Sequence, residues 1–181
     1  MADIIMNFEK GLGSYLTKEQ INAQAPLVFA KAPTNPNVTD KYLFVNTETI
    51  VNDLAKLNWF PVEVAQRKTR KEEGTIFSKH MVSFQNPEIK ITSEDGDDAY
   101  PRILLTNSHD GMQSFRFSVG IFRLVCSNGL VVADEEFSDF RIKHKGYSFG
   151  ELRNVVKQAV KDLPKRVEVM NDMKNRILTQ E

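Results

Sequence analysis

The stretch Leu104–Asp134, LLTNSHDGMQSFRFSVGIFRLVCSNGLVVAD, decides the fold class, because its two apolar runs each break off at a polar turn that contains glycine. Alternating apolar residues predict two half-buried strands, and the first of them begins near Arg102. Arg116 and Ser118 then point away from the core. The residues expected to face the core are Ile103, Leu105, Phe115, Phe117, Val119 and Ile121.

The polar residues of this stretch allow two interpretations. Asp-Gly and Asn-Gly pairs favour turns that need a positive φ, so Asp110–Gly111 and Asn128–Gly129 are predicted to reverse the chain. Alternatively, Cys126 is a nucleophile and His109 its base. If the chain turns at Gly111, His109 lies at the tip of the hairpin and Cys126 lies more than a dozen residues along the returning strand. At about 3.3 Å per residue, this separation is too large for a hydrogen bond. The structural interpretation is therefore favoured, with Cys126 a small buried hydrophobe.

Similar alternation precedes the hairpin, in FPVEV (60–64), TIFSKHMVSF (75–84), EIKIT (88–92) and YPRILLTN (100–107), with Trp59 expected in the core. Before these, a short strand over 42–45 and a helix with Ile50, Val51, Leu54 and Leu57 on one face are predicted, capped by Asn46 or Thr47. A long helix follows Tyr147, with a Ser148–Glu151 capping box and a kink or new start at Pro164. The fold class is α+β: an antiparallel meander with an early helix and a long C-terminal helix.

Prolines and asparagines crowd APLVFAKAPTNPNVTDK (25–41), so residues 1–40 are predicted to be an irregular arm. Residues 41–181 are then a single α+β domain.

Composition narrows the classes of function. The 181 residues contain 24 basic and 24 acidic side chains, so no global charge attracts polyanions. No apolar run approaches the roughly 18 residues that span a bilayer, and a single cysteine excludes an internal disulfide, so we expect a cytoplasmic protein without a membrane partner. His80, His109 and His144 lack metal-ligand spacing and are interpreted as surface or strand-edge histidines. No metal or cofactor is expected, and SEDGDD (93–98) is interpreted as a solvated turn.

Three motifs in order resemble the phage/plasmid-like protein family, the domain of unknown function 932. The similarity runs from about Tyr42 into the C-terminal helix. It implies a protein of a phage, prophage or plasmid that acts in a bacterial host cytoplasm, and it implies no chemistry for these residues. The matching residues are His109, Asp110 and Gly111, then Cys126, Asn128 and Gly129, then His144 and Gly146.

The favoured function is non-enzymatic binding of single- or double-stranded DNA by a basic sheet face. The structural alternative is that these charges form an ordinary solvated surface. The alternative function is a protein-binding factor, either a host-defence inhibitor or an assembly component, and a homo-oligomer is possible. For this function the C-terminal helix offers an apolar stripe of Val167, Met170, Met173 and Ile177. An enzyme is least expected, since no phosphate loop or nucleophile elbow is present. The candidate DNA-binding residues are Arg67, Lys68, Arg70, Lys71, Arg116, Arg141, Lys143 and Lys145.

Overall fold

The computed structural model describes residues 15–35, 38, 42, 44–67, 78–89, 100–110, 115–124, 131–142 and 148–174. For 121–124, 131–142 and parts of the last helix, the backbone alone is described. The helices are α2 (Lys18–Gln24), the 3-10 helix η1 (Pro26–Phe29), α3 (Thr47–Ala55) and α5 (Phe149–Lys174); the strands are β1 (Phe60–Gln66), β2 (Lys79–Gln85), β3 (Arg102–Ser108), β4 (Phe115–Leu124) and β5 (Val131–Ile142).

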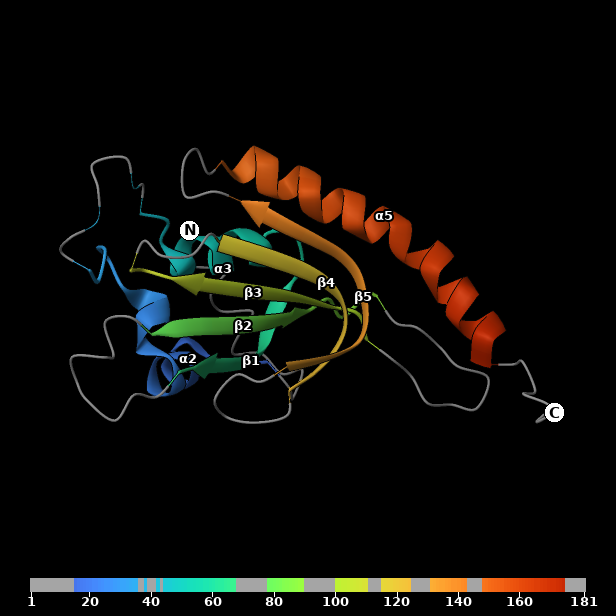
Figure 1. Ribbon diagram of the computed structural model, residues 1–181, viewed down its shortest axis with the longest axis horizontal. Helices are drawn as coiled ribbons and strands as arrows, with labels where there is room; N and C mark the ends of the chain where they lie inside the picture. The colour runs from blue at the N-terminus through green and yellow to red at the C-terminus, as the bar shows by residue number, and fades with distance from the viewer. Residues whose placement is uncertain are drawn as a thin grey trace.

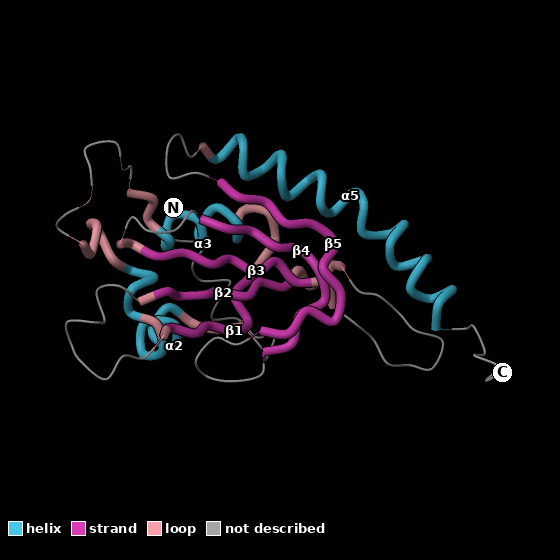
Figure 2. The backbone as a smooth tube through the Cα atoms, viewed as in Figure 1, coloured by secondary structure: helices cyan, strands magenta, loops and turns pink. Residues whose placement is uncertain are grey.

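The five strands form one sheet in the order β1-β2-β3-β4-β5, and every neighbouring pair is antiparallel. Figures 1 and 2 show this meander with α5 running past β5 at the edge of the sheet. The structure confirms the predicted α+β class, with its early helix and long C-terminal helix. Among the described residues, no helix is long and apolar enough to cross a membrane.

The core lies on one face of the sheet, where the predicted alternation is confirmed. One row of cross-strand partners, Val64, Val82, Leu105 and Phe117, runs across four strands and is buried throughout. Ile103, Phe115 and Val119 are buried on the same face. Residues of α2, η1, α3 and the first turns of α5 belong to the same apolar cluster: Ile21, Val28, Ile50, Leu54, Leu152 and Val156.

The end of α3 explains how the chain enters the sheet. The Trp59 amide donates to the Leu54 carbonyl (3.0 Å) and the Asn58 amide to the Ala55 carbonyl (3.1 Å), which is the Schellman pattern. Asn58 has φ 62°, a left-handed conformation that asparagine tolerates better than most residues. This turn places Trp59, 1% exposed, in the core as expected.

The predicted helix starts are confirmed where they are described. The Asn46 side chain accepts from the Glu48 amide (2.8 Å) and caps α3. The Ser148 hydroxyl accepts from the Glu151 amide (3.2 Å) at the start of α5. From there α5 is one continuous element through Pro164, so no new helix begins at that proline.

The prediction of an irregular arm over residues 1–40 is wrong for its described part. Thr17 and Gln20 form a capping box at the start of α2, and η1 follows directly. Ile21, Ala25 and Val28, at helical spacing, are buried in the core. Pro26 therefore lies in the first turn of η1, directly after α2, and both short helices contribute to the core.

Three further details of the strand predictions need correction. Tyr42, Phe44 and Val45 lie outside the sheet, because this segment leads into the cap of α3. The expected single alternation from Phe60 to Val64 is broken by a bulge between Pro61 and Glu63. Of the strand predicted over 88–92, residues 88 and 89 lie outside any strand, and 90–92 fall outside the described residues.

The hairpin of β4 and β5 is irregular as well. Its register shifts between Val119 and Gly120 and again between Ile121 and Phe122. Bulges bend strands and increase their twist, and Figure 1 shows both strands curving strongly at this part of the sheet.

Candidate functional site

Two of the three histidines lie in a buried polar cluster at one end of the sheet. His80 on β2 is the cross-strand partner of Asn107 on β3, and Thr47, the first residue of α3, contacts both. His80 is 1% exposed and His109 0% exposed. The interpretation of these residues as surface or strand-edge histidines is therefore wrong. His80 follows the inward phase of Val82 and Phe84, and this phase is the signal that could have placed it in the core.

Hydrogen bonds link Asn107, Thr47 and His80 within the cluster. The Ser108 amide donates to Asn107 Oδ1 (2.9 Å), so Asn107 Nδ2 is the donor to Thr47 Oγ1 (2.9 Å). Thr47 Oγ1 lies 2.8 Å from His80 Nε2 and can donate its own proton there. His80 Nδ1, the other ring nitrogen, is buried and has no hydrogen-bond partner among the described residues.

The same surroundings keep His80 uncharged. Burial, with a smaller contribution from neighbouring His109, lowers the pKa of His80 from 6.5 to about 3. The centroids of the His80 and His109 rings are 4.8 Å apart. Protonation of both rings would therefore place two positive charges close together. A neutral imidazole sealed from solvent suits a structural role.

His109 fastens the N-terminal segment to the sheet. Its Nε2 donates to the Leu27 carbonyl (2.9 Å), and its own carbonyl accepts from the Thr34 amide (2.9 Å). Asn35 Nδ2 donates to the Asp110 carbonyl (3.1 Å). The predicted turn residue Asp110 is itself buried and accepts from the Ser108 hydroxyl (2.7 Å), so it is not a solvated tip.

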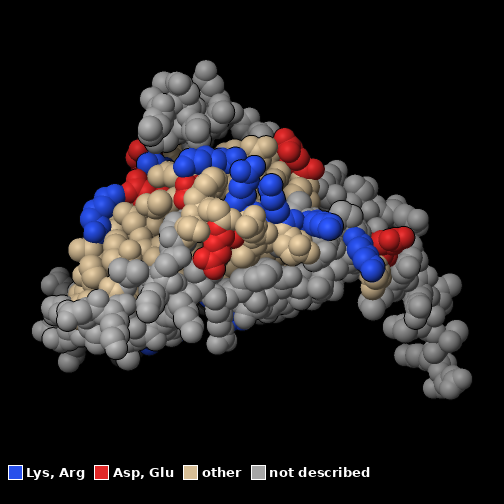
Figure 3. Space-filling model, turned by 90° about the horizontal axis from the view of Figure 1, so that it is seen from above, with Lys and Arg blue, Asp and Glu red and all other residues tan. Residues whose placement is uncertain are grey.

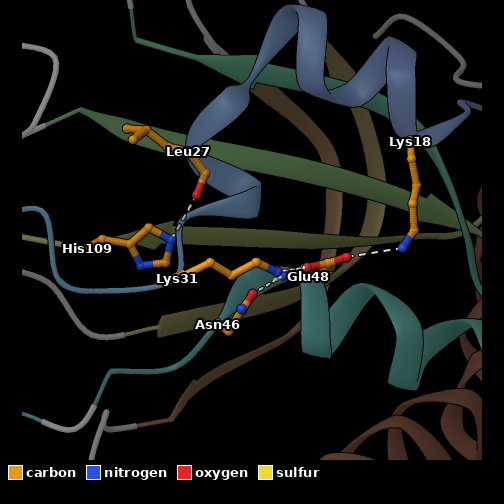
Figure 4. Close-up of polar contacts among 6 residues, drawn as sticks. All are labelled: Lys18, Leu27, Lys31, Asn46, Glu48 and His109. Carbon is orange, nitrogen blue, oxygen red and sulfur yellow. Dashed lines mark hydrogen bonds and ion pairs between the residues drawn. The ribbon is translucent and has the colours of Figure 1, made fainter.

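Glu48, on the first turn of α3, forms a second attachment for this segment. Figure 4 shows its carboxylate between Lys18 and Lys31, with the His109–Leu27 bond nearby. The Lys18 ammonium is 3.0 Å away, and Lys31 also donates to the carboxylate. The hydrogen bond from Lys31, more than any other contact, lowers the pKa of Glu48. Residues 18–35 are thus held by both apolar and polar contacts.

Within the described part of the chain, no group of three or more His, Cys, Asp and Glu side chains could hold a metal ion. The cluster instead joins α3, β2, β3 and the N-terminal segment at one point.

Basic side chains gather on the opposite face at the same end of the sheet. Arg67, Lys79 and Arg116 are exposed. Each directly follows or precedes a residue that faces the core, namely Gln66, His80 and Phe115, so the alternation of the strands places all three on the outward face. Ser118 lies on this face too, as expected, but it is buried.

Arg141 occupies the register position directly opposite Arg116. Arg67, Lys79, Arg116 and Arg141 are called the basic sheet end below. The structure thus brings three predicted residues to one end of one face, and it adds Lys79, which the sequence prediction missed although it directly precedes His80. The other predicted positions lie outside the described residues: Lys68, Arg70, Lys71, Lys143 and Lys145, together with Gly111, Cys126, Asn128, Gly129 and His144.

Comparison with known proteins places this fold in a family. The family described as "Domain of unknown function (DUF932)" matches residues 36–181. Two curated proteins of Escherichia coli (strain K12), "UPF0380 protein YfjQ" and "UPF0380 protein YafZ", are each 32% identical over 131 residues. These matches cover 72% of this chain and 45% of each relative, so the chain spans less than half of their length. No solved structure gives a significant match. Since the family match covers most of the sequence, the chain belongs to the DUF932 family.

Proposed function

We propose that this chain is a non-enzymatic nucleic-acid-binding protein whose basic sheet end contacts the phosphate backbone. The observation that carries the proposal is the register of β4 and β5, which puts Arg116 directly opposite Arg141. Like charges at directly opposite positions destabilise a sheet. A phosphate bound at this pair of positions would offset the repulsion between the two positive charges.

Near the other end of the outward face, Arg102 forms an ion pair with Glu63 (2.6 Å). Arg67 and Lys79 are exposed and meet at neighbouring positions, where the Arg67 amide donates to the Lys79 carbonyl (2.9 Å). The cationic positions thus spread over β1, β2, β4 and β5 at one end, a distribution that suits an extended anionic partner.

The setting proposed with this activity is a phage, prophage or plasmid in a bacterial host cytoplasm. Its support is the family resemblance. The names of the two Escherichia coli relatives specify no activity. The proposal that the protein is not an enzyme is supported by the closure of its His80–His109 cluster from solvent.

The test compares two variants that each remove two positive charges. Lys79→Gln/Arg116→Gln alters the basic sheet end, and Lys18→Gln/Lys31→Gln is the matched control, because these lysines bind Glu48. Binding of a labelled oligothymidine and of a labelled duplex is measured by fluorescence anisotropy at about 50 mM salt, where electrostatic contacts are strong. We expect weaker binding of both ligands by the first variant and near-native binding by the control.

A further variant removes a negative charge from the same face, which should have the opposite effect on binding. Asp139 lies opposite Ser118 and two residues from Arg141, so it is the nearest acidic register position on that side. Asp139→Asn should strengthen binding. If the wild-type protein binds neither ligand, the proposal is wrong and the protein-binding alternative takes its place. If Lys79→Gln/Arg116→Gln binds as the control does, this face is not the site.

A further inference from the structure

A second set of cations lies outside the sheet, on α5. Arg153, Lys157, Lys161 and Lys165 recur at every fourth position, and all four are exposed. Figure 3, which looks down on the side that carries α5, shows a band of Lys and Arg side chains there. These four residues are called the α5 basic row. It was not predicted from the sequence, although the i, i+4 spacing is visible there.

The geometry of the row is that of a regular linear array. Residues at i±4n form a continuous surface ridge inclined by about 26° to the helix axis. At about 1.5 Å per residue, the row extends over roughly 18 Å of helix. Among residues with described side chains, none makes an ion pair with the four. Glu151 and Glu168 flank the row, and Asp162 is the only acidic residue between Arg153 and Lys165 in the sequence.

The other side of α5 restricts the kind of partner. Leu152 and Val156 are buried in the core, so the apolar face of the first turns of α5 is already packed against the protein and is not free to insert into a lipid surface. Asn154 and Gln158, also exposed, add neutral polar groups beside the cations. A polar, evenly spaced cationic row fits a polymer with a regular series of phosphates better than it fits an irregular acidic protein surface.

We infer that the α5 basic row is a second phosphate-binding surface for nucleic acid. The inference rests on the proposed function, since it adds a contact to that ligand. It predicts that binding involves more phosphates than the sheet could contact alone. The apparent number of counterions released is therefore the quantity that separates one contact surface from two.

The experiment uses Lys157→Gln/Lys161→Gln in the full chain. Glutamine and lysine have similar helix propensities, and both positions are exposed, so α5 should keep its structure, which circular dichroism checks. Anisotropy titrations with labelled oligothymidine and labelled duplex are run between about 50 and 200 mM salt. Loss of two phosphate contacts should flatten the slope of log K against log salt by about 1.4 for the single strand or about 1.8 for the duplex. Lys18→Gln/Lys31→Gln is again the charge-matched control.

The outcomes separate this inference from the proposed function. If Lys157→Gln/Lys161→Gln keeps the wild-type affinity and slope while Lys79→Gln/Arg116→Gln weakens binding, the α5 inference is overturned and the proposed function stands. If the α5 variant alone weakens binding, the row is a site and the sheet assignment is wrong. If the control flattens the slope equally, the effect is one of net charge, and the inference fails. Absence of binding by the wild-type protein overturns both.

Discussion

Acidification should destabilise this protein through His80. Its pKa is about 3 in the folded chain and 6.5 by the ordinary value, so between these pH values the unfolded state binds the extra proton. The free energy of unfolding therefore rises with pH across this window and falls as the pH drops below about 6.5, at up to about 1.4 kcal/mol per pH unit. From about pH 7 to about pH 5 the loss from this one residue is about 2 kcal/mol.

The assay is urea unfolding of the wild-type protein and of His80→Gln at both pH values, followed by circular dichroism. Carboxylates titrate in both proteins, so the difference between the two pH dependences isolates His80. We expect the wild-type protein to lose about 2 kcal/mol more than the variant. Equal losses would refute the reasoning. If His80→Gln does not fold, the imidazole shifts of the wild-type protein give the same answer: His80 should stay neutral at about pH 5, and a titration midpoint near the ordinary 6.5 would contradict its burial.

Three substitutions test the packing and polar contacts that build the fold. Thr47→Val removes the hydroxyl that contacts Asn107 and His80, so it should lower the free energy of unfolding by about 2–4 kcal/mol. Thr49 is exposed on the same helix, so Thr49→Val is the control and should be nearly neutral. Urea unfolding measures both effects. Glu48→Gln should lower the free energy of unfolding by no more than about 1–2 kcal/mol, because the Lys18 and Lys31 side chains are exposed to solvent in part or for the most part. The substitution should nevertheless speed proteolytic cleavage between Pro26 and Asn35. Unchanged cleavage would mean that apolar contacts alone hold this segment. Leu105→Ala should cost about 2–5 kcal/mol, and a small effect would contradict its place in the buried row.

The sheet could be predicted because its signal is local. Alternation of apolar residues sets the inward phase of β3 and β4, and the side chains that follow this phase are buried. Asn46 is likewise a local cap signal, which the structure confirms. The capping box of Thr17 and Gln20 is an equally local signal. It indicates the start of α2 in the segment where the prolines suggested an irregular arm.

The buried histidines show where local patterns are insufficient. A single His in a strand is more often exposed than fully buried, and what makes His80 tolerable in the core is Thr47, 33 residues earlier and on another element. The basic sheet end has the same limitation. Arg116 and Arg141 are far apart in the sequence, and only the register of β4 and β5 makes them opposite each other.

The most direct measurement for the central proposal is the affinity of the wild-type chain for labelled oligothymidine and for a labelled duplex as salt rises from about 50 to about 200 mM. If the basic sheet end and the α5 basic row both contact phosphates, we expect binding at the lowest salt and a steep linear fall of log K, with a slope of about −3 or steeper for roughly four or more contacts to a single strand. No binding of either ligand at about 50 mM salt, or an affinity that does not change with salt, would contradict the account.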